Sequence, residues 1–559
     1  MGSVAAGAAA LGVVAGAATV VPDAAAAMPM MGRSPRAARP AVAVPVPDSW
    51  SQTADVVVVG YGGSGAIAAI TAFDAGADVI VLEKTPSFAT LGVSSPLYSG
   101  GGGSTSMNGG HFDYPSDPTM GATYLYNTSW GATPMPVCQA WASVSSQIPA
   151  WLASMGIPHT LSAGGATFPK VAGASTMNGG VVTGGGIQFF ISLDGLVRSR
   201  GIPVLFNTAA NSLIKDPASG EVLGVQALAN DSEVVSIRAN RAVILCTGGI
   251  EFNEQLKLNY IRAYPAHFYG WQFSTGDGLT MAQAAGAGTW HTDCVGATLV
   301  SWFPQYAQAF GTVTPSQNGW IYVDKRGNRF LNESATLRTN TYMSLSDFDL
   351  TVPEYTRIPS FIVFDEACRK AGPISSGSNG LLPAYIDPRP KWSSDNSVEL
   401  GNGWIKQGAT IADLVAAING TTYPGLPPGS GNAGPASAIS VNIDPNTLAN
   451  TINAYNGYCA AKLDQQFGRA PATLVPIQTP PFYAMPVWPG GEATFAGPIR
   501  NELGQVCDPS FNPIPRLYSA GELGSVRGAV VSAVSQNGEL IVSGQIAGHN
   551  AATENPWTA

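Results

Sequence analysis

The chain has 559 residues, with 27 Lys and Arg against 36 Asp and Glu and a formal net charge of −9. This length is enough for two or three domains and a large buried core. An acidic balance without a basic stripe excludes nucleic acid as a partner class, because phosphate binding requires a basic surface. The six cysteines are too far apart in sequence for a C-x-x-C motif, and we predict no metal site.

Residues 1–49 are predicted to be a leader and a Pro-rich linker that precede the folded part. The first 28 residues are rich in alanine and glycine, like the apolar region and small-residue cleavage zone of an export signal. No basic n-region or twin arginine is present, so this is either a twin-arginine export signal without its arginines or an alanine-rich disordered leader. We expect export to the cell envelope or beyond. A permanent membrane span is not expected, because alanine and glycine partition weakly into lipid.

Residues 54–84 carry the pattern of a dinucleotide-binding β-α-β unit. The apolar run from Val56 to Val59 predicts a buried parallel strand, and a helical pattern and a second strand follow. Between the first strand and the helix lies G-x-G-x-x-G, which permits a tight turn, approach to a pyrophosphate and close helix–strand packing. An acid at the end of the second strand binds ribose hydroxyls. The candidate residues are Gly60, Gly62, Gly65, Glu83 and the adjacent Lys84.

From about residue 50 to 550 the chain resembles the flavoprotein family of fumarate reductases, urocanate reductase and 3-ketosteroid dehydrogenases. It is similar in particular to exported gut-bacterial flavin reductases of the cardiac glycoside type. The motifs are GGSTSMNGGHF (102–112), RAVILCTGGIEFN (241–253), STGDGLTMAQAAGA (274–287), RLYSAGELGS (516–525) and SQNGELIVSGQIAG (535–548).

The resemblance implies FAD rather than NAD, in an α/β fold. A Rossmann-like FAD-binding domain, with a parallel sheet and inserted β-structure, would occupy residues 50–290 and 476–559. An α+β capping domain would occupy residues 291–475.

Motif matching extends the set of residues implied to bind FAD. Glu522 would bind the ribityl chain, and the helix starting near Asn537 would direct N–H groups at the pyrimidine end of the ring. The resemblance implies non-covalent FAD, since no histidine matches the covalent flavin position of succinate dehydrogenases. No haem or cluster motif is present, so electrons would come from an external cytochrome or quinol-linked partner. The further cofactor candidates are Ser104, Thr105, Ser106, Gly109, Gly110, Gly248, Asp277, Gly521 and Leu540.

The stretch PPFYAMPVWPGGEATFAG (480–497) is predicted to be a poor helix and a poor central strand, because of its prolines and glycines. In the family's ketosteroid dehydrogenases, the matching tyrosine and a backbone amide hold the substrate's carbonyl oxygen. The match implies Tyr483 and the Ala493 amide in this oxyanion-hole role. Fumarate reductases carry carboxylate-binding histidines and an arginine where this chain has Glu492 and Val530. A dicarboxylate substrate is therefore not expected.

The segment NESATLRTNTY (332–342) offers Arg338 or Tyr342 to protonate the substrate α-carbon. The leading hypothesis is an FAD-dependent oxidoreductase that interconverts C–C and C=C bonds beside the ketone of a bulky apolar substrate, running as a reductase with hydride exchanged at flavin N5. One alternative is an unsaturated monocarboxylate reductase of the urocanate or fumarate reductase type, with Arg338 or Arg527 as the anchor. The other is a flavin electron-transfer protein with no substrate, although a cap that shields hydride from water has no use in a carrier.

One further segment has two open interpretations. The aromatic residues of LVSWFPQYAQAF (299–310) either line an apolar substrate pocket or form the core of the cap.

Overall fold

The computed structural model describes residues 44–92, 98–334, 338–377, 382, 386–427, 430, 434–532 and 536–557. Residues 37–559 form one compact unit. The expected export signal falls on residues 1–43, outside the described residues, and stays a prediction. None of the helices that the model describes is long and apolar enough to cross a membrane.

A mainly parallel sheet forms the first half of the architecture, in the order β21-β22-β9-β1-β2-β6. Strand β1 (Gln52–Val59) pairs in parallel with β2 (Val79–Leu82) on one side and with β9 (Glu233–Leu245) on the other. Antiparallel pairing of β7 with β8 and of β8 with β9 adds the inserted β-structure, which confirms the predicted fold class. The other strands are β6 (Val204–Leu205), β7 (Thr208–Lys215), β8 (Val222–Ala229), β21 (Gln505–Cys507) and β22 (Pro513–Ser519).

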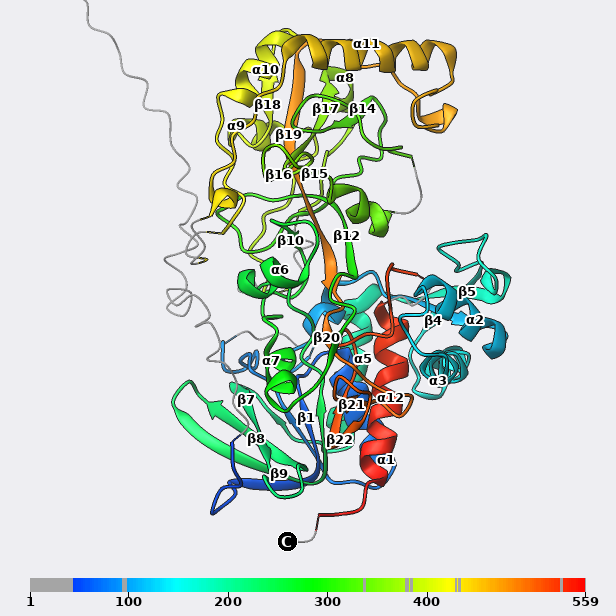
Figure 1. The fold of residues 1–559 in the computed structure, drawn as a ribbon, viewed down its shortest axis with the longest axis vertical. Helices are drawn as coiled ribbons and strands as arrows, with labels where there is room; N and C mark the ends of the chain where they lie inside the picture. The colour runs from blue at the N-terminus through cyan, green and yellow to red at the C-terminus, as the bar shows by residue number, and fades with distance from the viewer. Residues whose placement is uncertain are drawn as a thin grey trace, which may run out of the picture. The chain divides into compact units, whose positions relative to one another are not determined.

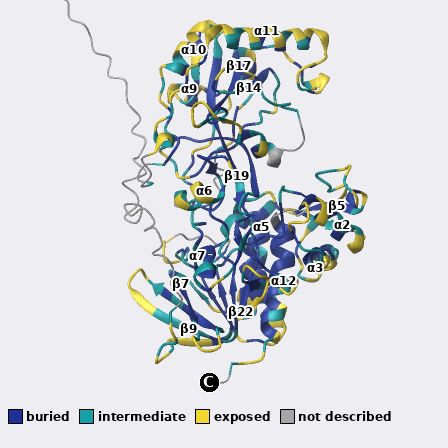
Figure 2. Cartoon of the chain, in the orientation of Figure 1, coloured by how far each residue is buried: buried dark blue, intermediate teal, exposed yellow. Residues whose placement is uncertain are grey.

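Two helices of small residues pack closely beside this sheet. Helix α1 (Gly63–Asp74) and helix α12 (Gln536–Thr553) lie side by side, and their shared face is buried (Figures 1 and 2). A Cβ atom at Gly548 of α12 would lie only 2.5 Å from the carbonyl oxygen of Ala68 in α1. Glycine thus permits an approach that places the start of both helices at the same end of the sheet.

A second sheet has the order β13-β12-β19-β17-β14, with β10 and β18 also paired to β19. The segment 476–559 contributes β19 to this sheet and β21 and β22 to the first one. The second sheet therefore includes a strand from beyond residue 475, and the domain boundary between residues 475 and 476 stays a prediction. Its strands are β10 (His267–Phe268), β12 (Val295–Ser301), β13 (Gly311–Thr312), β14 (Trp320–Val323), β17 (Ser360–Asp365), β18 (Lys406–Gly408) and β19 (Phe482–Thr494).

Strand β19 corrects the prediction that residues 480–497 would make a poor central strand. Pro486 pairs only with β17, and Pro489 only with β12, so each proline lies where β19 has one neighbour and needs no donor on the other side. Gly490 lets the chains approach, because a Cβ there would lie 1.7 Å from the carbonyl oxygen of His267. The long orange strand in Figure 1 runs through the second sheet toward the cofactor-binding sheet.

The remaining elements complete the two halves. Three strands, β3 (His111–Pro115), β4 (His159–Ala163) and β5 (Met177–Val182), form a small antiparallel sheet. Two further pairs are β11 (Thr289–Trp290) with β20 (Gly497–Pro498), and β15 (Phe348–Asp349) with β16 (Glu354–Tyr355). The other helices are α2 (Pro118–Thr128), α3 (Met135–Ser145), α4 (Ile148–Ser154), α5 (Gly185–Ser199), α6 (Glu254–Tyr260), α7 (Asp277–Ala284), α8 (Glu366–Ala371), α9 (Ser397–Gly401), α10 (Ile411–Asn419) and α11 (Pro445–Ala461).

Packing around the second sheet combines aromatic contacts with a buried ion-pair network. Trp302 is 1% exposed and stacks on the His267 ring at 3.6 Å, so this part of the 299–310 segment is core. The Arg329 guanidinium bonds the Glu333 carboxylate at 2.6 Å and that of Asp464 at 3.0 Å, with all three side chains at 0% exposure. All six cysteines are buried and unpaired.

Candidate cofactor and substrate site

The loop between β1 and α1 forms a cradle for a phosphate group. Gly60 has a φ of +103°, and a Cβ at Gly65 would lie 1.9 Å from the Gly60 carbonyl oxygen, so both positions require glycine. Gly62 caps α1 without a side-chain hydrogen bond of its own, and among the N–H groups of the first turn that of Gly63 donates to the Thr105 hydroxyl at 3.1 Å. Those N–H groups and the helix dipole fit a pyrophosphate.

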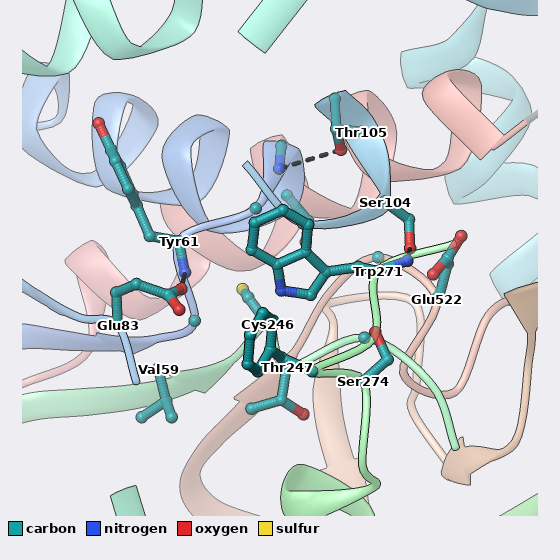
Figure 3. Close-up of a pocket in the computed structure, with 18 of the residues that line it drawn as sticks. Val59, Tyr61, Glu83, Ser104, Thr105, Cys246, Thr247, Trp271, Ser274 and Glu522 are labelled. Carbon is teal, nitrogen blue, oxygen red and sulfur yellow. Dashed lines mark hydrogen bonds between the residues drawn. The ribbon is translucent and has the colours of Figure 1, made fainter. Parts of the chain in front are cut away.

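This cradle opens into a pocket whose empty space, including the solvent at its mouth, is about 830 Å³ (Figure 3). It runs from the end of β2, past the loop at residues 103–105, to the turn before α12. The lining includes most of the predicted FAD-binding residues: Gly60, Gly62, Glu83, Lys84, Ser104, Thr105, Gly248, Asp277, Gly521, Glu522 and Leu540.

The other predicted cofactor residues are not among those that line the pocket. Gly65 provides the close helix–strand contact, and the Ser106 hydroxyl donates to the Gly103 carbonyl at 2.9 Å. Gly110 has a φ of +78° and lies against Gly185, whereas a Cβ at Gly109 would lie 3.0 Å from the His111 ring. The Asn537 side chain donates to the backbone carbonyl of His111 at 2.9 Å and to the side-chain amide oxygen of Asn108 at 3.0 Å. These residues therefore support the backbone of the loops that line the pocket and do not line it themselves.

At the β2 end of the pocket, the predicted ribose-binding acid is already oriented by the fold. One Glu83 carboxylate oxygen accepts a hydrogen bond from the Tyr61 amide at 2.9 Å (Figure 3). The other accepts two hydrogen bonds from Thr85. The Lys84 ammonium pairs with the Asp277 carboxylate at 2.7 Å, which joins the end of β2 to the start of α7.

Several lining residues lay beyond the sequence motifs. Trp271 projects into the pocket in Figure 3, and its amide donates to the Ser104 hydroxyl at 3.4 Å. Phe273 also lines the pocket. Trp271 and Phe273 directly precede the STGDG motif, and only that adjacency could have indicated them.

Two buried carboxyl groups lie beside the flavin half of the pocket. Glu251 accepts hydrogen bonds from the Thr494 amide and hydroxyl, and burial raises the pKa of Glu251 to about 7. Burial, with repulsion from Glu251, also holds the pKa of Glu522 well above its usual range. Such perturbed carboxyls gather at functional sites.

The structure does not bring Tyr483 and Ala493 together. They are ten positions apart on the continuous strand β19, which at about 3.3 Å per residue separates them by roughly 30 Å. The Tyr483 hydroxyl donates to the Glu366 carboxylate at 2.7 Å, and its ring stacks on Phe364 at 5.5 Å. The prediction that both residues hold one carbonyl oxygen is therefore wrong. The extended strand, which composition did not indicate, is the physical reason.

The other predicted catalytic residues have different surroundings. Ala493 pairs with Gly296 of β12, and its side chain packs against Cys294 and Phe495. Tyr342 is 1% exposed, and its hydroxyl accepts a hydrogen bond from the Ala263 amide at 2.8 Å, so it serves as a core contact. Arg338 begins a short 3-10 helix, Arg338–Leu345, and its side chain lies outside the described residues. Its role stays a prediction.

A polar cluster that the sequence did not reveal lies where β19 meets the cofactor loops. Strand β19 carries a bulge there, because Gly491 and Ala493 pair with consecutive residues of β12 and leave Glu492 unmatched. The Tyr269 hydroxyl donates to the Glu492 carboxylate, and this bond together with burial holds the Tyr269 pKa well above its usual range. Arg389 stands nearby, with its charge bonded to Asp387 at 2.7 and 2.8 Å.

Arg527 is a further charged group close to the bulge in β19. Its side chain is 1% exposed, its guanidinium lies 4.2 Å from the centre of the Phe495 ring, and its Nε has no hydrogen-bond partner among the described residues. Burial lowers the pKa of Arg527. A buried cation with an unused donor is costly unless a ligand completes it.

Comparisons with known proteins agree with the geometry. The family model described as FAD binding domain matches residues 55–533. NADH:fumarate oxidoreductase of Klebsiella pneumoniae (strain 342) is 26% identical over 532 residues, which cover 90% of this chain and 48% of that protein. The chain thus spans about half the length of that relative.

Two further matches are a curated relative and a solved structure. Digoxin reductase of Eggerthella lenta is 41% identical over 120 residues, which cover 21% of each protein. The crystal structure of 3-ketosteroid delta1-dehydrogenase from Sterolibacterium denitrificans in complex with 1,4-androstadiene-3,17-dione shares the fold. Its TM-score is 0.72 at 20% identity, over 90% of this chain and all of that one.

Proposed function

We propose that this chain, which belongs to the FAD binding domain family, reduces a C=C bond beside the ketone of a bulky, uncharged substrate. Members of this family are FAD-dependent oxidoreductases that act on CH–CH bonds. FAD supplies hydride chemistry when bound. The cradle at Gly60 to Gly65 and the pocket from Glu83 to Glu522 would hold it. The names of the two steroid-related matches support a bulky apolar skeleton.

The carboxyl group of Glu492 is the observation that carries the choice of an uncharged substrate. A Cβ at Gly270 would lie 2.7 Å from the Glu492 carbonyl oxygen and 3.2 Å from the hydroxyl of Ser104, which lines the cofactor pocket. Glu492 is therefore next to the flavin end of the site. A carboxylate substrate needs charge-assisted donors to offset its desolvation, and a carboxyl group supplies no cation in either protonation state. Arg389 is already neutralised by Asp387.

A second candidate function rests on Arg527. Its buried guanidinium, with the free Nε, could bind one carboxylate close to Ala493 and Phe495. This would fit reduction of an unsaturated monocarboxylate. The charge balance is less favourable than for a neutral ketone, because Glu492 and Glu522 both act electrostatically on Arg527.

We further propose that an external cytochrome or a quinol-linked protein reduces the flavin and that the protein works after export. Anaerobic mixing of the oxidised holoenzyme with a reduced cytochrome or a soluble quinol tests the first part, and fractionation of cells that express the full chain tests the second. Bleaching of the flavin by neither donor, or recovery in the cytosol alone, would contradict the respective part.

The substrate class is tested by reoxidation of the dithionite-reduced holoenzyme under anaerobic conditions. The oxidants are steroid-sized enones, small enones and enoates, and the return of oxidised flavin absorbance is followed in stopped flow. We expect enones, the larger ones above all, to reoxidise the flavin. Reoxidation by enoates alone would support the Arg527 candidate, and reoxidation by none would remove both.

A further inference from the structure

The bulge in β19 has a consequence for proton transfer. Bulges occur next to active sites, where they redirect a side chain out of the regular alternation of a strand. Here the bulged residue is Glu492, between Gly491 and Ala493, which remain paired with β12. The neighbouring chain is fixed on both sides, because the Tyr269 amide donates to the Gly491 carbonyl at 3.0 Å and the Trp271 amide contacts the Ser104 hydroxyl. The bulge therefore lies beside Gly270, where an added Cβ would be 2.7 Å from the Glu492 carbonyl oxygen and 3.2 Å from the hydroxyl of Ser104, which lines the cofactor pocket.

The charges around Glu492 determine what its carboxyl group can do. Tyr269 donates a hydrogen bond to it, and the charge of Arg389 acts on the same tyrosine. Glu522, in the pocket wall, and the buried Arg527 also interact with its charge. The Tyr269 donor and the Arg527 charge favour the ionised form of Glu492, whereas the Glu522 charge opposes it. Tyr342 and Tyr483, which the sequence suggested as catalytic residues, form hydrogen bonds with the Ala263 amide and the Glu366 carboxylate instead.

We propose that Glu492 is the acid–base residue that exchanges a proton with the substrate α-carbon, and that Tyr269 positions its carboxyl group. This inference rests on the proposed reduction of a C=C bond beside a ketone. The alkene π bond breaks while one carbon receives a hydride from the reduced cofactor and the other receives the Glu492 proton. Two C–H bonds form, the cofactor is oxidised by two electrons, and the Glu492 carboxylate regains a proton from solvent.

Glu492→Gln keeps the size of the side chain and removes the acid. The first readout is substrate-driven reoxidation of the reduced holoenzyme, where we expect a fall of about 10²- to 10⁴-fold, the usual contribution of general acid–base catalysis. The second readout uses oxidised holoenzyme with the saturated ketone in D₂O, and NMR follows deuterium entry at the α-carbon. This exchange needs a base but no net electron transfer, and it should fall in parallel. The third readout is the affinity for the ligand, measured from the change in flavin absorbance on binding. This affinity should stay within about threefold of the wild-type value, because the neutral amide of glutamine can keep the contacts that the carboxyl group makes with the ligand.

Two more variants serve as a control and as a test of the positioning role. Glu502→Gln alters an exposed carboxylate and should leave every readout at the wild-type value. Tyr269→Phe removes a donor to the ionised carboxylate, raises its pKa and moves the alkaline limb of the rate–pH profile to higher pH. Wild-type reoxidation and deuterium exchange in Glu492→Gln would overturn the acid–base role, and an unmoved profile in Tyr269→Phe would overturn the positioning role. If no enone reoxidises the wild-type holoenzyme, the proposed function fails instead.

Discussion

Replacement of Gly65 by alanine is a steric test of the cofactor cradle. The added Cβ would lie 1.9 Å from the Gly60 carbonyl oxygen, whereas real Cβ contacts are essentially never below 3.0 Å. The start of α1 and the glycine turn must therefore separate by about 1 Å, which displaces the N–H groups that would bind the pyrophosphate. Overpacking of this kind costs about 1–3 kcal/mol. If the strain is relieved by opening the cradle, FAD affinity falls by about 10- to 100-fold.

Gly195→Ala is the matched control, because Gly195 also lies in a helix, α5, but has no atom within 4 Å of the added Cβ. Alanine at such a site stabilises the fold by about 0.4–1 kcal/mol. FAD content after purification, FAD affinity from flavin fluorescence and circular dichroism would be measured for both variants. Full FAD affinity in a folded Gly65→Ala protein would refute the cradle geometry.

Three other substitutions test separate parts of the structure. Arg329→Met removes the cation that pairs with Asp464 and leaves Glu333 with Arg469 alone, at 3.5 Å, so it should lower the free energy of unfolding by about 3–5 kcal/mol in urea titrations. Arg326→Met, at a side chain 56% exposed, should cost about 1 kcal/mol or less, and equal losses would contradict the burial argument. Tyr483→Phe removes a hydrogen bond distant from the cofactor, so stability should fall by about 1 kcal/mol with turnover unchanged; a loss of about 10²-fold in turnover would restore its carbonyl-binding role. Glu251 has a pKa raised from 4.5 to about 7, so the folded state holds a proton that the unfolded chain releases, and stability should fall as pH rises from about 4.5 to about 7. Glu251→Gln should flatten that slope, and an unchanged slope would show that another group causes it.

The cofactor half of the site was largely predictable from sequence because its information is local. Val56 to Val59, the three glycines and Glu83 lie within one β-α-β unit, so strand, turn and helix signals reinforce each other. The fold class and most of the pocket lining followed from such motifs.

The substrate half was not predictable in the same way, because it depends on how distant segments pair. Pro486 and Pro489 suggested a break in the chain, yet β19 changes neighbours between them and accommodates both. That extended strand separates Tyr483 from the cofactor, and its bulge brings Glu492 to Tyr269, a residue 223 positions earlier in the chain. No periodicity or spacing in either segment signals this contact, which tertiary packing creates.

The central claim, that the site reduces an uncharged carbonyl substrate, is tested most directly by two oxidants of nearly the same shape. Benzylideneacetone and cinnamate share a phenyl-substituted C=C bond and differ in a methyl ketone against a carboxylate. Each is mixed anaerobically with dithionite-reduced holoenzyme, and the rate of flavin reoxidation is measured as a function of concentration. The ketone should reoxidise the flavin at least about 10²-fold faster, since the carboxylate lacks a charge-assisted partner beside Glu492. Faster reoxidation by cinnamate would contradict the account.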